Sequence, residues 1–165
     1  MSLSFSISST DLAKLQKYLE GVQSKVNLTD PKVKDLLKEK LEKIMFEDLK
    51  KRFASSPSTT VGGIVYGNEE WSSLSDYYIS KRPDRAGGQI YKDTLDLSNS
   101  LIAMTSDTIS EFKEKGSQGV TYIFGTKIKY AEKLQEMRPI VFLHEELIEE
   151  LVEAYKEFII EKEKD

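Results

Sequence analysis

Two carboxylates, Asp93 and Asp96, have the spacing in this chain that is best suited to chemistry. They lie in GGQIYKDTLDLSNSLIA, residues 87–103, and could bind a divalent metal or act as an acid–base pair. A structural interpretation fits the same spacing, because Asp93 suits the N-cap of a short helix and Asp96 the partner position of a capping box. No supporting catalytic group accompanies the pair, so we favour the cap.

The single histidine, His144, precedes Glu145 and Glu146 near the predicted start of the last helix. Adjacent residues on a helix do not face one another, so a His–Glu ligand pair is poorly supported and a surface histidine is expected. The chain has no cysteine, which excludes disulfides, thiolate chemistry and sulfur-ligated zinc. The nucleophile-elbow, P-loop, dinucleotide and zinc-helix patterns are missing. We therefore expect no enzyme activity, no bound metal and no cofactor.

Composition predicts one ordered domain covering residues 1–165, with 39% hydrophobic and 32% charged residues. The formal net charge of −4 argues against broad or sequence-specific nucleic-acid binding, which needs a basic footprint. The lysines of residues 34–53 alternate with acids, so that helix should present a solvated face. No apolar run approaches the ~20 residues of a membrane span, and no signal-peptide pattern is seen.

Hydrophobic periodicity predicts a strand over residues 2–8, a short helix over 8–22 and a long helix that starts with Asp30 as N-cap and Pro31 at its first position. Asp48 and Arg52 are among the i, i+4 ion pairs expected on its polar faces. The apolar face of the long helix comprises Val33, Leu36, Leu37, Leu41, Ile44, Met45, Leu49 and Phe53.

Glycine, serine and proline predict long, mobile loops over residues 54–69 and 82–89, with a short helix or turn around 74–82 between them. Residues 100–126 suggest three short strands, with turns at Ser106–Asp107 and at Gly116–Gly119. Arg138–Pro139 should hold the chain extended before a final helix, which ends in a charged tail over 161–165. The last helix carries a stripe of Leu143, Leu147, Ile148, Leu151, Val152, Tyr155, Phe158 and Ile159. The expected fold is α+β, a small antiparallel sheet packed against two long amphipathic helices, with long central loops.

Four short motifs in order give the chain a resemblance to the phage virion morphogenesis family, the tail-completion or neck proteins of Mu-like and related tailed phages. Each motif is weak alone, and together they span roughly residues 30 to 160. The first motif comprises Trp71, Leu74, Ser75, Tyr77 or Tyr78, and Lys81. The second comprises Ile90, Asp93, Thr94, Leu97, Ser100 and Leu101. The third and fourth comprise Gly125, Tyr130 and Ala131, then Arg138 and Pro139.

The chain departs from this family pattern at two places. Leu95 stands where the family prefers glycine, so a left-handed backbone there would require tolerated strain. Residues 132–137, EKLQEM, replace a segment that often carries His-Gln and a glycine-containing loop.

The resemblance implies a non-enzymatic structural protein that joins head to tail, or completes the tail end, during virion assembly. It implies an α+β subunit that assembles as a ring with other neck and tail proteins, in the host cytoplasm and then in the virion. Because the candidate contacts lie in loops, we expect a monomer or weak oligomer in isolation. Trp71 and two tyrosines, Tyr66 and Tyr77, are our first candidates for part of the assembly interface.

Two other functions remain open on the sequence. One is a protein-interaction or adaptor domain, outside phage biology, whose aromatic loops bind another protein. The other, which we favour less, is a metal-dependent hydrolase using Asp93 and Asp96.

Overall fold

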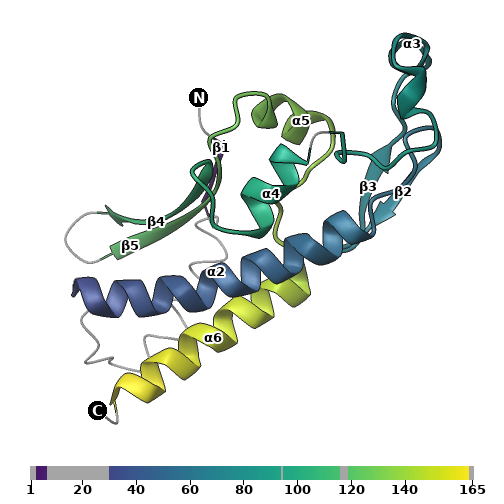
Figure 1. Cartoon of the computed structure of the whole chain (residues 1–165). Coiled ribbons are helices and arrows are strands. Elements are labelled where there is room, and N and C mark those ends of the chain that lie inside the picture. Colours follow the sequence, from purple (N-terminus) through teal and green to yellow (C-terminus); the bar gives the residue numbers. More distant parts are fainter. Residues whose placement is uncertain (1–2, 7–29, 94, 116–118, 164–165) are drawn as a thin grey trace.

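The chain folds as an α+β protein, as predicted, and in the computed structural model its described residues form one three-stranded and one two-stranded antiparallel sheet (Figure 1). The structure describes residues 3–6, 30–93, 95–115 and 119–163, so the helix predicted over 8–22 lies outside the described residues. The elements are β1 (Leu3–Ser6), α2 (Pro31–Ala54), β2 (Gly62–Val65), β3 (Glu69–Ser72), α3 (Asp76–Lys81), the 3-10 helix η1 (Pro83–Arg85), α4 (Asp96–Ile102), β4 (Thr108–Lys115), β5 (Gly119–Thr126), α5 (Ala131–Met137) and α6 (Glu145–Glu163).

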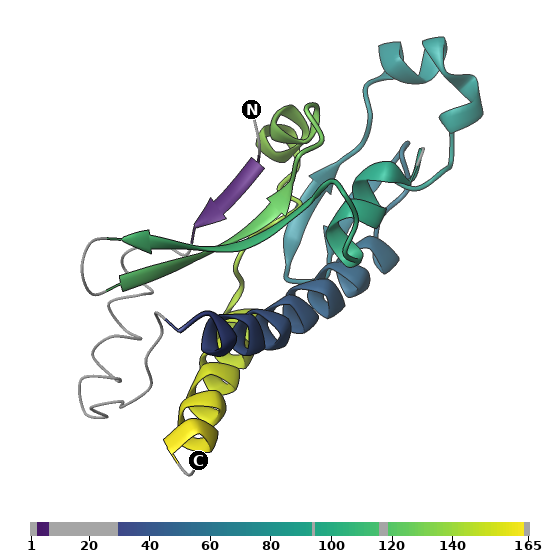
Figure 2. The ribbon, with the colours of Figure 1, turned by 60° about the vertical axis from the view of Figure 1, so that its left-hand side comes forward.

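Helix α2 begins where the sequence predicts. The Asp30 carboxylate accepts a 2.8 Å hydrogen bond from the backbone N–H of Lys32, and Pro31 occupies the first turn, where its missing N–H costs nothing. The buried face is narrower than the predicted one, because Leu36 is 46% exposed. The helix lies between the large sheet and α6 in both ribbon views (Figures 1 and 2).

The three-stranded sheet has the order β1–β5–β4, and all its pairs are antiparallel. Tyr122 and Phe124 of β5 are buried, and Phe124 meets Phe46 of α2 edge-on at 5.6 Å between ring centroids. Alternate residues of the strand point to opposite faces, so this face of the sheet forms the core with α2.

Among the described residues of 100–126 there are two strands, β4 and β5, so the predicted third strand is wrong. Its apolar residues belong to α4, in which Leu101 is fully buried. The end of α4 is tied to the sheet by side chains: Ser100 Oγ lies 2.8 Å from Thr126 Oγ1, and the Thr108 hydroxyl donates to the Ser100 carbonyl at 2.9 Å. A buried helical turn and a buried strand share the same short apolar run, so periodicity alone could not separate them.

Residues 54–69 were predicted to be irregular, and this is wrong for their second half, which forms β2 and the turn of a hairpin with β3. Gly67 and Asn68 adopt positive φ values of 92° and 64° at the turn, a conformation common in tight hairpins. The first half of this segment lies against residues 82–90. The Thr59 N–H donates to the Gly88 carbonyl at 2.8 Å, and the Ile90 N–H donates to the Pro57 carbonyl at 3.0 Å. The mobility of both segments stays a prediction.

The short helix predicted after Trp71 is confirmed as α3. The Ser75 side chain caps it by accepting from Tyr78 N–H at 3.2 Å. The β2–β3 hairpin and α3 together form an arm that extends away from the large sheet (Figure 1).

Candidate functional site

Two buried polar clusters connect segments that are far apart in the sequence. The first, which we call the Trp71 junction, comprises Trp71, Tyr91, Arg138 and Pro139 with the carbonyls of Ser72 and Ser73. The Trp71 indole N–H donates to the Pro139 carbonyl at 2.7 Å. The Arg138 guanidinium donates to the Ser72 and Ser73 carbonyls, each at 2.6 Å. Trp71 is 0% and Arg138 4% exposed, so these bonds are shielded from water.

Tyr91 completes the Trp71 junction from the loop before α4. Its hydroxyl lies 2.9 Å from the Leu134 carbonyl and 3.2 Å from the Arg138 carbonyl. Its ring meets that of Trp71 edge-on, with 4.9 Å between centroids. Burial raises the pKa of Tyr91 to about 12. Its backbone φ is +62°, a strained value for an aromatic residue, which the surrounding contacts hold in place.

The junction unites residues from the first and fourth sequence motifs, Trp71 with Arg138 and Pro139. The remaining motif residues take structural positions. Leu74 N–H donates to the Thr59 carbonyl at 2.7 Å, next to the helix cap Ser75. Leu97, Gly125 and Ala131 are buried, Tyr130 is 49% exposed, and Thr94 lies outside the described residues.

Asp93 is not the N-cap of α4, so that prediction is wrong. The N-cap position belongs to Leu95 and has no side-chain hydrogen bond. The Asp93 carboxylate instead accepts from Arg82 at 3.2 Å and lies 3.6 Å from Arg85 Nη1, two cations that attract it away from the helix end. Asp96 lies in the first turn of α4. Leu95 has φ +65°, the left-handed conformation that would suit the glycine expected by the resemblance.

The second cluster, the His144 junction, comprises Asp48, Arg52, His144 and the carbonyls of Tyr66 and Ile140. His144 Nε2 lies 2.6 Å from Asp48 Oδ1, and the other Asp48 oxygen accepts from Arg52 at 2.5 Å. Arg52 also donates to the Ile140 carbonyl at 2.5 Å and the Tyr66 carbonyl at 3.3 Å. Burial lowers the pKa of Arg52, while Asp48 opposes that shift.

His144 is therefore not a surface residue, and Asp48–Arg52 is not a solvated pair, so both of these predictions are wrong. The side chains of His144, Asp48 and Arg52 are 11%, 3% and 1% exposed. The Arg52 guanidinium also lies 3.7 Å from the ring centroid of Phe142, a stacked cation–π contact. One feature of the sequence did indicate that this pair is buried. Asp48 and Arg52 follow Met45 at helical spacing, so all three residues lie on the same, buried face of the helix.

Tyr66, Lys51 and Glu146 form the outer edge of the His144 junction. Tyr66 donates from its hydroxyl to Glu146 at 2.8 Å and receives a 3.3 Å bond from Lys51. Burial and the bond to Glu146 raise the pKa of Tyr66, and the bond to Tyr66 raises that of Lys51. These contacts tie the hairpin turn to α2 and α6.

The three residues predicted to lie at an assembly interface differ in their exposure to solvent. Trp71 is wholly buried and cannot reach a partner, so its assignment to the interface is wrong; its indole N–H and ring are used inside the Trp71 junction. Tyr66 is partly buried in its contacts with Lys51 and Glu146. Tyr77 is 73% exposed. Two apolar residues in the same region of the molecule are also exposed, Val61 at 80% and Ile64 at 69%.

Across the residues that the structure describes, no three histidine or acidic side chains gather in a way that could hold a metal. Among the same residues, no helix is both long and apolar enough to cross a membrane. The buried polar side chains of both junctions chiefly contact backbone carbonyls or one another, an arrangement that fixes segments in place. No family model matches the chain, and no curated protein or solved structure matches it either.

Proposed function

We propose that this chain is a structural protein of phage or prophage assembly that joins head to tail or completes the tail end. One observation carries the proposal. Motif residues that the resemblance draws from separate stretches, Trp71 with Arg138 and Pro139, share one buried junction. If these motif residues belong to the family pattern because they hold the fold together, they should lie in contact with one another. Residues that match the motifs by chance need not be in contact.

The junction also supports a role in assembly. Arg138 and Trp71 hold strand β3 and the residues after it against the segment between α5 and α6. The His144 junction holds the other end of the same hairpin, through the bond from Arg52 to the Tyr66 carbonyl. An arm fixed at both ends of its hairpin can present exposed side chains without a large ordering cost on binding.

We place the protein in the host cytoplasm during assembly and then in the virion, among neck and tail proteins. In isolation it is a monomer or weak oligomer, and it closes into a ring when docked. As a non-enzymatic component, it acts through contacts alone.

Deletion of the gene from the phage or inducible prophage that carries it tests the proposal. Electron microscopy of the lysate should show filled heads and tails that are unjoined, or tails with aberrant ends. The wild-type gene supplied in trans should restore whole particles, and so should the exposed-site variant Lys133→Ala. Intact, infectious particles from the deletion strain would refute the proposal.

A further inference from the structure

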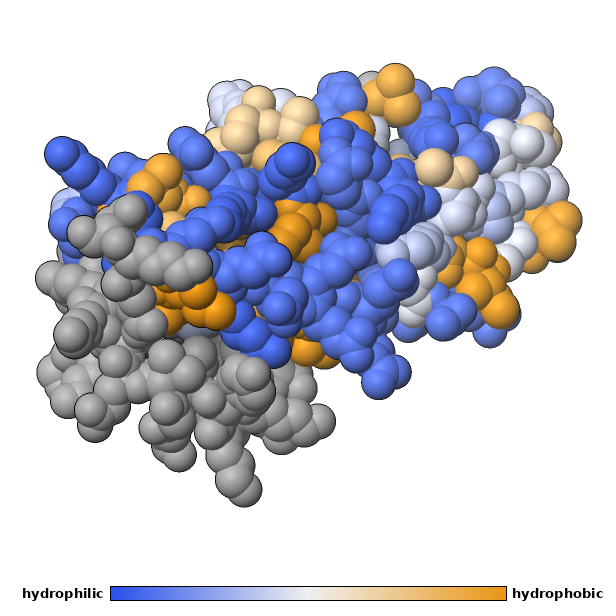
Figure 3. Space-filling model, turned by 90° about the horizontal axis from the view of Figure 1, so that it is seen from below, coloured by the Kyte–Doolittle hydropathy of each residue, from blue (hydrophilic) through white to orange (hydrophobic). Residues whose placement is uncertain are grey.

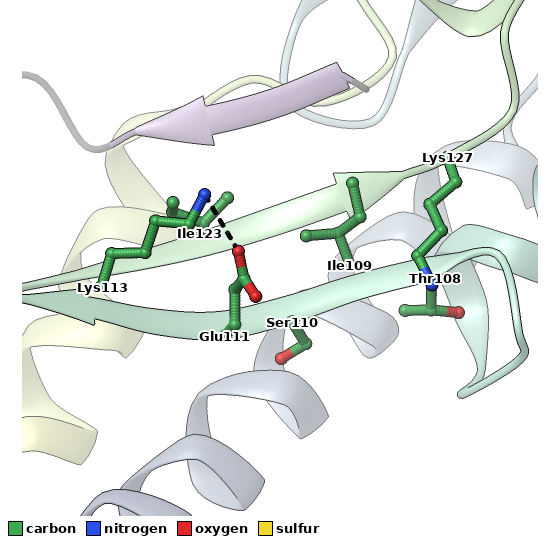
Figure 4. Close-up of a pocket in the computed structure, with 7 residues that line it drawn as sticks. All are labelled: Thr108, Ile109, Ser110, Glu111, Lys113, Ile123 and Lys127. Atoms are coloured by element: carbon green, nitrogen blue, oxygen red, sulfur yellow. Dashed lines mark ion pairs between the residues drawn. The ribbon is translucent and has the colours of Figure 1, made fainter. Parts of the chain in front are cut away.

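The outer face of the large sheet carries a hollow of about 440 Å³ (Figure 4). Ile109 of β4 and Ile123 of β5 lie in it and are partly exposed. Their neighbours Ser110 and Phe124 are buried on the opposite face, toward α2. The hollow lies on the side of the sheet that α2 does not cover, and it combines these two isoleucines with polar and charged residues.

The charged side chains that line this hollow are two lysines and one glutamate, Lys113, Lys127 and Glu111. Lys113 Nζ lies 3.2 Å from Glu111, and Lys127 Nζ donates to the Ser106 carbonyl at 2.8 Å. Since Glu111 offsets one of the lysines, the hollow has a net positive charge. It suits an apolar group accompanied by a carboxylate.

The β2–β3 hairpin presents a patch of that chemistry. Ile64 is 69% and Val61 80% exposed. Ile64 pairs directly with Glu70 in the hairpin register, so the two side chains share one face. Glu70 is exposed too. Hydrophobic residues appear among polar ones at the hairpin end of the molecule in Figure 3.

The patch and the hollow lie on different parts of the molecule, because the hairpin extends away from the large sheet (Figure 1). We propose that the hairpin patch of one copy docks into the sheet hollow of a second copy, with Ile64 against Ile109 and Ile123. Glu70 then lies beside the lysines of that hollow. A contact between two different surfaces is heterologous and repeats from copy to copy, so it closes into a ring or continues as a filament.

This inference names a second copy as the partner and rests on the proposed function for its biological setting. The hairpin side of the contact offers two exposed apolar side chains, Ile64 and Val61, so one such contact should be weak in solution. Docking on a neck or tail end raises the effective concentration of neighbouring copies and closes the ring. Weak self-association of the free chain and ring formation on the virion are thus compatible.

The absence of native cysteine makes disulfide cross-linking a clean test. One chain carries Ile64→Cys and the other carries Ile109→Cys. In an independent second pair, the other chain carries Ile123→Cys instead of Ile109→Cys. The two chains are mixed at high concentration under mild oxidation. Both pairs should give a mixed dimer at several times the yield of Ile64→Cys with Glu149→Cys, an exposed control on α6. A yield equal to that control for both pairs overturns the proposal.

Charge reversal tests the same contact independently. Adding Glu70→Lys to the Ile64→Cys chain should lower the mixed-dimer yield several-fold. Adding Lys127→Glu to the Ile109→Cys chain should restore part of it, since the reversed pair attracts again. Unchanged yields in both mixtures would contradict the proposed orientation.

The outcomes separate this proposal from the proposed function. If the deletion strain fails to assemble particles but the cross-linking yield equals that of the control, the docking contact is rejected and the assembly function stands. Strong cross-linking with normal particles from the deletion strain would keep the contact and reject the assembly function.

Discussion

The indole N–H of Trp71 donates a 2.7 Å hydrogen bond to the carbonyl of Pro139, across 68 residues of sequence. Trp71 lies on the hairpin and Pro139 just before the last helix, so one side chain fixes how these two segments meet. Arg138 strengthens the same contact by donating to the two carbonyls that follow Trp71. The arm therefore has a defined direction relative to the core.

Replacing Trp71 with Phe should lower the free energy of unfolding by about 2–4 kcal/mol, because it leaves a buried carbonyl unsatisfied and opens a cavity. Denaturant titration measures the loss. Tyr77→Leu changes an exposed aromatic residue on the same arm and should alter stability by less than about 0.5 kcal/mol. Equal effects of the two variants would contradict the role assigned to Trp71.

Asp48→Ala should cost about 3–5 kcal/mol, because it leaves the buried Arg52 charge without its carboxylate. The matched control is Glu47→Ala on the same helix, whose partner Lys50 is solvent-accessible; this change should have no measurable effect on stability. Thermal or urea unfolding distinguishes the two. If Asp48→Ala unfolds like Glu47→Ala, then the His144 junction does not hold the helices as described.

Leu95→Gly should be more stable than Leu95→Ala by up to about 1 kcal/mol, since glycine relieves the left-handed strain at φ +65° and alanine retains it. Leu95 is 48% exposed, and both variants lose the same side-chain contacts beyond Cβ. Comparing them therefore isolates the backbone. An alanine variant at least as stable as the glycine variant would show that residue 95 is unstrained.

The buried phenol of Tyr91 predicts a loss of stability in alkali. It ionises at its ordinary pKa of 10.0 in the unfolded chain and at about 12 in the folded one. The folded state thus keeps its proton longer, so this contribution to stability is complete below pH 10 and is lost as the pH rises through 12. Between those values the free energy of unfolding should fall more steeply for wild type than for Tyr91→Phe. Identical slopes would argue against burial of the phenol, and Tyr77→Phe serves as the control.

Asp93→Asn tests the revised role of this carboxylate. As an exposed partner of Arg82, Asp93 should contribute less than about 1 kcal/mol, and less at high salt. Stability in urea, measured at low and high ionic strength, checks this. Metal-dependent hydrolysis abolished by Asp93→Asn, without a change in stability, would instead support the hydrolase alternative.

Local signals in the sequence were enough for the two long helices, for the short helix α3 and for the class of fold. Asp30 and Pro31 gave the start of α2, and apolar spacing gave both long helices, because capping and amphipathicity are local properties. Strand β5 was also recognisable, from the alternation of Tyr122 and Phe124 with Thr121 and Ile123.

The polar junctions could not be predicted in the same way. Asp48 and Arg52 look like an ordinary surface pair. They are buried and completed by residues distant in the sequence, among them His144, 96 residues from Asp48, and Phe142. Trp71 was expected at an interface because an isolated aromatic residue fits a core and a contact surface equally well. The left-handed Leu95 was hidden for a similar reason, since tertiary contacts can impose a backbone that the local sequence disfavours.

The location of the protein in mature particles tests the central claim most directly. Cryo-electron microscopy of purified virions, with the chain traced in the map, should place it as a ring at the head–tail junction or at the tail end. The same map shows whether the β2–β3 hairpin of one subunit contacts its neighbour. Purified virions that contain no copy of the chain, or that carry it elsewhere, would contradict this account of its function.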